Sequence, residues 1–153
     1  MSTTTQATDT VLSVSNLTVC FAGAPANVVD GVSFSVQRGK TLAIVGESGC
    51  GKSVTSMALM GLLPDTAKIA ARTSALLDEA LLGMPDERLL DVRGNRMAMI
   101  FQEPMTSLNP VFTIGEQIAE SVIRHQGLSA RDARQRALQM LAKVRLPDAA
   151  QRL

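Results

Sequence analysis

The sequence contains no tryptophan and no tyrosine, and aromatic residues make up only 3% of the chain. A surface that binds bases or sugars by repeated stacking needs more flat rings than this composition offers. The formal net charge is +1, whereas nucleic-acid-binding domains usually carry a clustered basic surface. We therefore predict that nucleic acid is not a partner.

Long apolar segments are also missing. No run approaches the ~20 apolar residues that a membrane-spanning helix requires, and the polar residues 1–10 lack the basic and apolar parts of a secretory signal. Cys20 and Cys50 are the only cysteines, and two thiols in a cytosolic chain are expected to be reduced and independent of each other. We predict a cytoplasmic protein that reaches a membrane only through a partner.

The remaining composition, 46% hydrophobic and 19% charged, is enough for one packed domain of 153 residues. After a disordered segment at residues 1–10, residues 11–19 alternate in a period of two and predict a strand. Strict alternation places Leu17 and Val19 on one face and Val14 on the other. Residues 32–36 alternate again, so we expect two antiparallel strands with one solvated face.

Two short apolar runs have a different pattern. Residues 41–45 and 97–101 are continuously apolar, as in strands that are buried on both faces of a central sheet. The first run leads through a glycine-rich loop into a helix predicted over 52–63, which Pro64 ends. Residues 66–93 are the least clear, with a strand near 74–77 and a short helix over 85–92.

Two helices are predicted near the end of the sequence. Thr113 and Glu116 form the capping-box pattern, and Gly127 stops the helix that follows them. Ser129 and Asp132 repeat the capping pattern for a second amphipathic helix. Both helices begin at a hydrogen-bonding side chain, which is the strongest local signal for a helix start.

Residues 46–53, which lie between a predicted strand and a predicted helix, match the P-loop pattern G-x-x-x-x-G-K-[ST] in full. In such a loop the backbone N–H groups surround phosphate oxygens at the positive end of a helix. Lys52 would reach the β- and γ-phosphates, and the Ser53 hydroxyl would bind Mg²⁺. A glycine-rich turn with an incidental lysine is the alternative. The predicted nucleotide-binding residues are Gly46, Glu47, Ser48, Gly49, Cys50, Gly51, Lys52 and Ser53.

A second motif narrows the class of nucleotide-binding protein. Gln102 begins the proline-bounded segment Gln-Glu-Pro-Met-Thr-Ser-Leu-Asn-Pro, which resembles the Q-loop of ABC ATPases. Residues 99–110 resemble the oligopeptide and dipeptide importer subfamily, and residues 92–94 and 97–121 are similar to its glutathione-importing members. The resemblance covers nearly all of the chain from Val11 onward and is weakest between residues 66 and 88.

The resemblance implies an α/β fold of the P-loop NTPase type with an antiparallel β subdomain. The β subdomain and P-loop core would occupy residues 11–101, the Q-loop 102–110 and the start of a helical subdomain 111–153. Gln102 would contact Mg²⁺ and the attacking water as a catalytic residue, and Phe21 would stack on adenine. An ordinary polar residue at a strand end and an ordinary core residue are the respective alternatives.

By the same resemblance, the chain is an ATP-binding subunit that energises an ABC importer for glutathione or for di- and oligopeptides, with ATP and Mg²⁺ as cofactors. Its partners would be membrane permease subunits at the inner face of the cell membrane and a second ATP-binding domain, separate or fused. A periplasmic binding protein would act indirectly through the permease.

No part of the sequence resembles the signature motif, the Walker B aspartate, the catalytic glutamate or the switch histidine of ABC ATPases. We therefore expect a truncated chain that does not turn over ATP alone, with residues 41–45 and 97–101 lacking their partner strands. Two alternatives are a nucleotide- or permease-binding fragment without turnover and an ABC ATPase outside transport. The Q-loop segment argues against the second of these.

Overall fold

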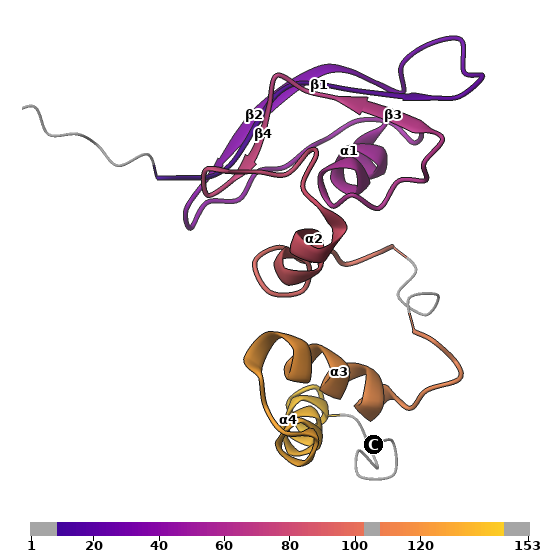
Figure 1. The fold of residues 1–153 in the computed structure, drawn as a ribbon. Coiled ribbons are helices and arrows are strands. Elements are labelled where there is room, and N and C mark those ends of the chain that lie inside the picture. The colour runs from indigo at the N-terminus through magenta and orange to yellow at the C-terminus, as the bar shows by residue number, and fades with distance from the viewer. Residues whose placement is uncertain (1–8, 103–107, 146–153) are drawn as a thin grey trace, which may run out of the picture. The chain divides into compact units, whose positions relative to one another are not determined.

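The computed structural model describes residues 9–102 and 108–145. The chain divides into two compact units, Met1–Leu89 and Leu90–Leu153. The first unit is a β-sheet with one helix, and the second consists mainly of helices (Figure 1). Each helix in the described ranges is too short or too polar to traverse a lipid bilayer.

The sheet of the first unit is antiparallel and is organised around β1 (Thr10–Phe21). β2 (Val29–Gln37) pairs with one edge of β1, which confirms the predicted pair of antiparallel strands. β1 begins at Thr10, the last residue of the segment predicted to be disordered. A long central strand with partners inside the same unit can satisfy its backbone groups locally.

The other edge of β1 is shared by two short strands. β4 (Thr73–Leu76) pairs with the first half of β1, and β3 (Ala67–Ala70) pairs with the second half of β1. β5 (Glu79–Ala80) pairs antiparallel with β4. β4 lies within one residue of the strand predicted near 74–77. β3 was not predicted, because four residues with one large apolar side chain carry little periodic signal.

A bulge in β1 changes which side chains are buried. Asn16 has a positive φ of 54°, and its N–H donates to the Ser33 hydroxyl at 2.8 Å. The register with β2 shifts between Val14 and Leu17, so both of these side chains, together with Val19, are buried. The predicted strict alternation was therefore wrong across this point, because an inserted residue turns the following side chains to the opposite face.

Helix α1 (Lys52–Leu59) packs against β1 (Figure 1). Its side chains Ala58 and Leu59 are buried, as are Leu17 and Val19 of the sheet. The helix starts where the sequence predicted but ends earlier, because Met60 closes the last turn and Gly61 adopts a left-handed φ of 62°.

The two continuous apolar runs are not strands in the described residues. Residues 41–45 form no ladder and are all exposed, with Val45 at 87%. Residues 97–101 form only an isolated bridge between Met97 and Arg93, and Ile100 is 93% exposed. The prediction of two buried strands was wrong here, because within the described ranges no strand lies beside either run to complete its hydrogen bonds.

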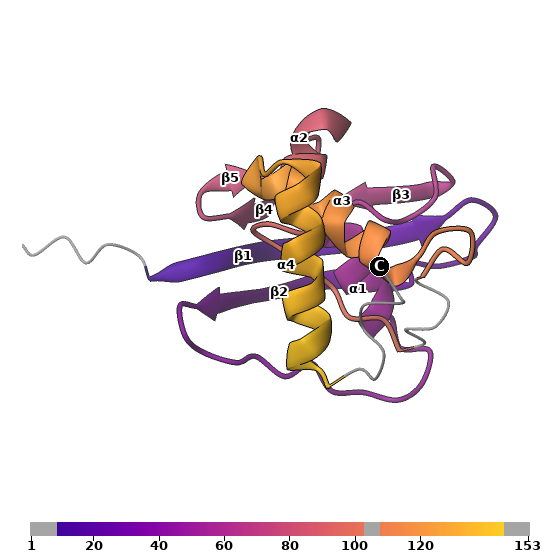
Figure 2. The same cartoon turned by 90° about the horizontal axis from the view of Figure 1, so that it is seen from below.

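The second unit contains helices α3 (Ile114–Gln126) and α4 (Ala130–Lys143), which pack against each other (Figure 2). Its buried cluster contains Ala119, Val122 and Ala133. Small side chains at a contact allow two helices to approach closely. α2 (Asp86–Val92), which was predicted over 85–92, crosses the boundary between the units.

The predicted starts of both helices in the second unit and the predicted end of α3 are confirmed. The Thr113 hydroxyl accepts the Glu116 N–H at 3.1 Å, and the Glu116 carboxylate accepts the Thr113 N–H at 2.8 Å, which is a complete capping box. Gly127 ends α3 with a left-handed φ of 64°. Ser129 caps α4 by accepting the Asp132 N–H.

Candidate phosphate-binding site

The loop before α1 depends on glycine at several positions. Gly49 and Gly51 have left-handed φ values of 83° and 89°, which side chains other than hydrogen rarely tolerate. At Gly46 a different constraint applies, because an added Cβ would lie 2.6 Å from the Cys50 sulfur. The left-handed backbone therefore explains the glycines at positions 49 and 51, whereas at Gly46 the added atom would meet a side chain, the Cys50 thiol.

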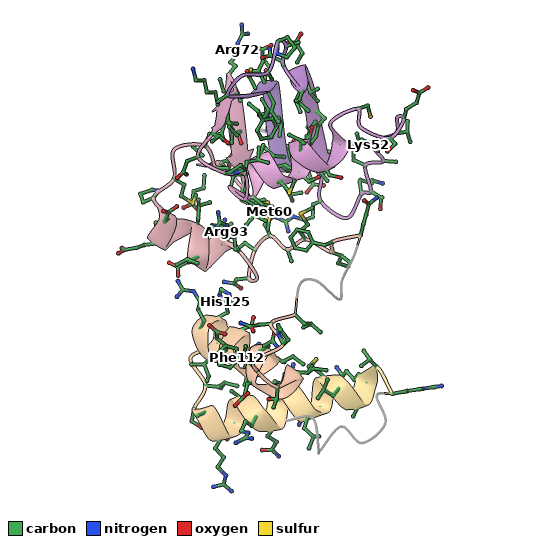
Figure 3. The ribbon with its side chains drawn as sticks, turned by 90° about the vertical axis from the view of Figure 1, so that its right-hand side faces the viewer. Lys52, Met60, Arg72, Arg93, Phe112 and His125 are labelled. Atoms are coloured by element: carbon green, nitrogen blue, oxygen red, sulfur yellow. The ribbon has the colours of Figure 1, made fainter. Side chains whose placement is uncertain are left out.

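The Lys52 side chain, which is labelled in Figure 3, forms hydrogen bonds with the loop that precedes it. Its Nζ donates to the Gly46 carbonyl at 2.8 Å and to the Glu47 carbonyl at 2.6 Å, and it lies 3.4 Å from the Cys50 sulfur. An ammonium group has three donors, and these contacts use all of them. An incoming phosphate would exchange some of these partners for its own oxygens.

The start of α1 provides further positive potential. Gly51 is the N-cap and has no side chain to cap the helix, and the first turn contains no acidic residue. Free N–H groups at a helix start carry a partial positive charge and favour an anion. Ser53 is exposed in this first turn. The glycine backbone, the Lys52 ammonium and the uncapped helix start suit a triphosphate, and the Ser53 hydroxyl is a suitable oxygen ligand for its Mg²⁺.

One residue that the sequence analysis did not single out stabilises this loop. Thr55 is buried and donates both its N–H, at 2.8 Å, and its hydroxyl, at 3.0 Å, to the Gly51 carbonyl. A polar residue on the buried side of an amphipathic helix was the available signal. Thr55 fixes the last residue of the loop to the first turn of α1.

Two of the predicted site residues, Phe21 and Gln102, come from segments outside residues 46–53. Phe21 is the half-buried last residue of β1, and its carbonyl accepts the Ala24 N–H at 3.0 Å. Gln102 is exposed and belongs to the second unit, and most of the Q-loop segment after it lies outside the described residues. The structure brings residues 46–53 together, whereas the roles of Phe21 at adenine and Gln102 at Mg²⁺ and water stay predictions.

The second unit has an open cavity of about 670 Å³ beside α3. Arg124 and Asp91 form an ion pair at 3.1 Å on its wall. The backbone N–H and the hydroxyl of Thr113 lower the pKa of Glu116, another residue of the wall. Arg124 and Asp91 therefore pair with each other, and the Glu116 carboxylate accepts hydrogen bonds from Thr113. Within the described ranges, no group of three or more His, Cys, Asp or Glu residues is arranged to hold a metal ion.

Cys20 and Cys50 are both free thiols, as predicted. Cys20 is half-buried in β1 and its sulfur contacts the Phe21 and Ala26 carbonyls. Cys50 is exposed on the phosphate loop beside Lys52. The two cysteines therefore lie on different elements and have different surroundings.

Comparison with known proteins adds a family and several relatives. A family model described as "ABC transporter" matches residues 29–153. The dipeptide transport ATP-binding protein DppD of Bacillus subtilis (strain 168) is 47% identical over 146 residues, which are 94% of this chain and 44% of that protein. The oligopeptide transport ATP-binding protein AppD of the same organism is 47% identical over 138 residues, which are 88% of this chain and 42% of AppD.

A third relative has the same kind of name. The glutathione import ATP-binding protein GsiA of Escherichia coli (strain K12) is 49% identical over 147 residues, which are 91% of this chain and 24% of GsiA. The chain therefore spans less than half the length of each of these relatives.

Proposed function

The chain belongs to the ABC transporter family, and from that premise we propose that residues 46–53 bind ATP with Mg²⁺ to energise import through a membrane permease. The observation that carries this proposal is the Lys52 ammonium, which is held on the Gly46 and Glu47 carbonyls at the uncapped start of α1. A fixed positive charge beside free backbone N–H groups is the arrangement that a triphosphate requires.

The residues of the loop would divide the work of binding. The Lys52 ammonium neutralises the β- and γ-phosphates, and the backbone N–H groups of the loop orient their oxygens. The Ser53 hydroxyl provides an oxygen ligand for Mg²⁺, a hard cation that prefers such ligands. The remaining side chains of the loop, including Cys50, need only leave the backbone accessible.

Two further roles rest on the resemblance of their motifs. Phe21, at the end of β1, would stack its ring on adenine, since stacking requires only a flat surface. Gln102 would contact Mg²⁺ and the attacking water and transmit the nucleotide state to the permease. A neutral amide can approach both without adding charge to the site.

The relatives support peptides as the transported class. Two are named as dipeptide and oligopeptide transport proteins and one as a glutathione import protein. We propose that this chain serves an importer for peptides, including glutathione as one candidate, at the inner face of the cell membrane. Permease subunits and a second ATP-binding domain would be direct partners, and a periplasmic binding protein an indirect one.

A second candidate function concerns the 153-residue chain by itself. Hydrolysis of ATP needs a carboxylate for the metal and a group that orients the attacking water in addition to a phosphate loop. We propose that this chain alone binds Mg²⁺–ATP without sustained turnover. Phosphate release by the wild type above that of a Lys52→Ala variant, in a preparation free of other ATPases, would contradict this second proposal.

The test of the phosphate site compares fluorescent-ATP binding, in the presence of Mg²⁺, for the wild type, Lys52→Ala and Lys68→Ala. Lys68 is exposed on β3, so its removal changes the net charge equally without touching the loop. Losing a hydrogen bond to a charged group costs about 1.5–3 kcal/mol, so Lys52→Ala should weaken binding roughly tenfold to a hundredfold. Equal affinities of the wild type and Lys52→Ala would overturn the assignment.

A further inference from the structure

The start of β2 lies directly against the phosphate loop. Gly51 is buried and has a φ of 89°. A Cβ added there would lie 2.6 Å from the Val28 carbonyl oxygen and 3.2 Å from Cγ2 of Val29. No side chain fits in this space, so the contact joins the backbone of the loop to the sheet.

Both sides of this contact are fixed. The Val28 N–H donates to the Val19 carbonyl at 2.8 Å, and Val29 is only 3% exposed. On the loop side, Thr55 donates twice to the Gly51 carbonyl. Residues 46–50, in contrast, are all exposed. Gly51 is therefore the point at which the loop is attached to a rigid core.

We infer that the start of β2, through the Val28 carbonyl and the Val29 side chain, positions the phosphate loop by fixing Gly51. Lys52 and Ser53 follow Gly51 directly, so its placement sets the direction of both. Val29 is thus a positioning residue, because its effect on the loop would act through Gly51. This inference rests on the proposed function of residues 46–53, and it adds a determinant that lies outside the motif.

The inference separates an effect on binding from an effect on stability. Any substitution of a buried valine destabilises the sheet, because buried methyl groups are lost. Only a substitution that touches Gly51 should also displace the loop. A displaced loop would weaken the hydrogen bonds of Lys52 and the backbone to phosphate, and losing one charged hydrogen bond costs about tenfold or more in affinity. A measurable loss of phosphate affinity is therefore expected at position 29 alone.

The first experiment compares Val29→Ala with Val14→Ala. Both valines are 3% exposed in the same sheet, but Val14 is paired with Phe34 and Ser74. The probe is Mg²⁺–tripolyphosphate, measured by competition with fluorescent ATP under conditions in which both variants keep the wild-type circular dichroism. We expect similar losses of stability and an affinity about tenfold weaker for Val29→Ala alone.

Equal affinities for these two variants would overturn the inference. A wild-type chain that binds tripolyphosphate no better than Lys52→Ala would instead overturn the proposed function. The two failures are therefore distinguishable, because the first requires a wild type that binds and the second a wild type that does not.

A second pair of variants covers the case in which Val29→Ala does not fold. Gly49→Ala and Gly51→Ala carry the same left-handed strain, with φ values of 83° and 89°. The Cβ at position 49 would meet nothing within 4 Å, whereas the Cβ at position 51 would meet Val28 and Val29. We expect Gly51→Ala to weaken tripolyphosphate binding at least several-fold more than Gly49→Ala. Equal losses would show that backbone strain, rather than the contact of Gly51 with Val28 and Val29, sets the affinity.

Discussion

β1 and residues 41–45 were both predicted to be strands but have opposite surroundings in the structure. β1 has β2 on one edge and β3 and β4 on the other, and its Leu17 side chain is fully buried. Residues 41–45 are all exposed and form no ladder. The contrast shows that an apolar run indicates a need for partners, which neighbouring strands must then meet.

A similar contrast holds within the second unit between helix α3 and residues 97–101, which were predicted to form a strand. α3 satisfies its backbone hydrogen bonds internally, so one neighbour, α4, is enough to bury Val122. Residues 97–101 cannot do so, and Ile100 stays exposed. A segment that completes its hydrogen bonds locally is thus less dependent on distant parts of a fold than a central strand is.

The sharpest test of the contrast compares Leu17→Ala with Ile44→Ala. Leu17 is 0% exposed and Ile44 is 44% exposed. Removing a fully buried leucine side chain should lower the free energy of unfolding by about 2–5 kcal/mol, whereas a surface substitution should change it by less than about 0.5 kcal/mol. Urea unfolding followed by far-ultraviolet circular dichroism measures both.

This comparison would be broken by an equal loss of stability in the two variants. Such a result would mean that residues 41–45 are buried in solution by a contact that the described residues do not provide. Protection of the amides of residues 41–45 from hydrogen exchange would point to the same conclusion.

Loss of the N-cap of α3 should give the next largest change in stability. Thr113→Ala removes the side chain that accepts the Glu116 N–H, and loss of an N-cap costs about 0.5–2 kcal/mol. Ser121→Ala is the matched control, because Ser121 is exposed within the same helix and alanine is favourable there. Thermal unfolding should show a loss for Thr113→Ala only, and equal melting of the two variants would contradict the capping role.

A smaller effect is expected from the exposed apolar residues themselves. Val45→Lys should lower the fluorescence of a dye that binds exposed hydrophobic surface and change stability by less than about 0.5 kcal/mol. Ser35→Lys, at an exposed position of β2, controls for the added charge. Unchanged dye binding in Val45→Lys would show that this segment is not the accessible apolar surface.

Features with a clear pattern or motif in the sequence were predictable from it. The capping box of Thr113 and Glu116, the Gly127 helix end and the pairing of the first two strands are confirmed. The family model also confirms the predicted family and, through it, the α/β P-loop fold class. Each of these signals is contained in a short stretch of sequence or in a complete motif.

Features that depend on distant contacts were not predictable in the same way. The bulge at Asn16 involves the Ser33 hydroxyl of the neighbouring strand, and the position of Gly51 depends on its close contact with the Val28 carbonyl. The exposure of residues 41–45 depends on which strands lie nearby, which an apolar pattern cannot report. For residues 46–53, the motif predicted which residues form the loop but not the contacts of Gly51 with Val28, Val29 and Thr55 that hold it in place.

The smallest expected effect concerns the charge that completes the α3 cap. The Thr113 N–H and hydroxyl lower the pKa of Glu116 below its ordinary value of 4.5. A carboxylate whose pKa is lowered by folding contributes stability that is fully present above the ordinary pKa. That contribution is lost as the pH falls through the lower pKa of the folded state, because protonation removes the charge that accepts both hydrogen bonds.

Glu116→Gln keeps an acceptor for the capping box but cannot titrate. Thermal melts from neutral pH to below 4.5 should therefore show a steeper loss of stability for the wild type than for Glu116→Gln, confined to the acid end of the range. Since Glu116 is exposed, solvent screens its charge and the difference should be smaller than that produced by Thr113→Ala. Parallel pH profiles of the two proteins would show that the capping box of α3 depends on the geometry of the carboxyl group rather than on its charge.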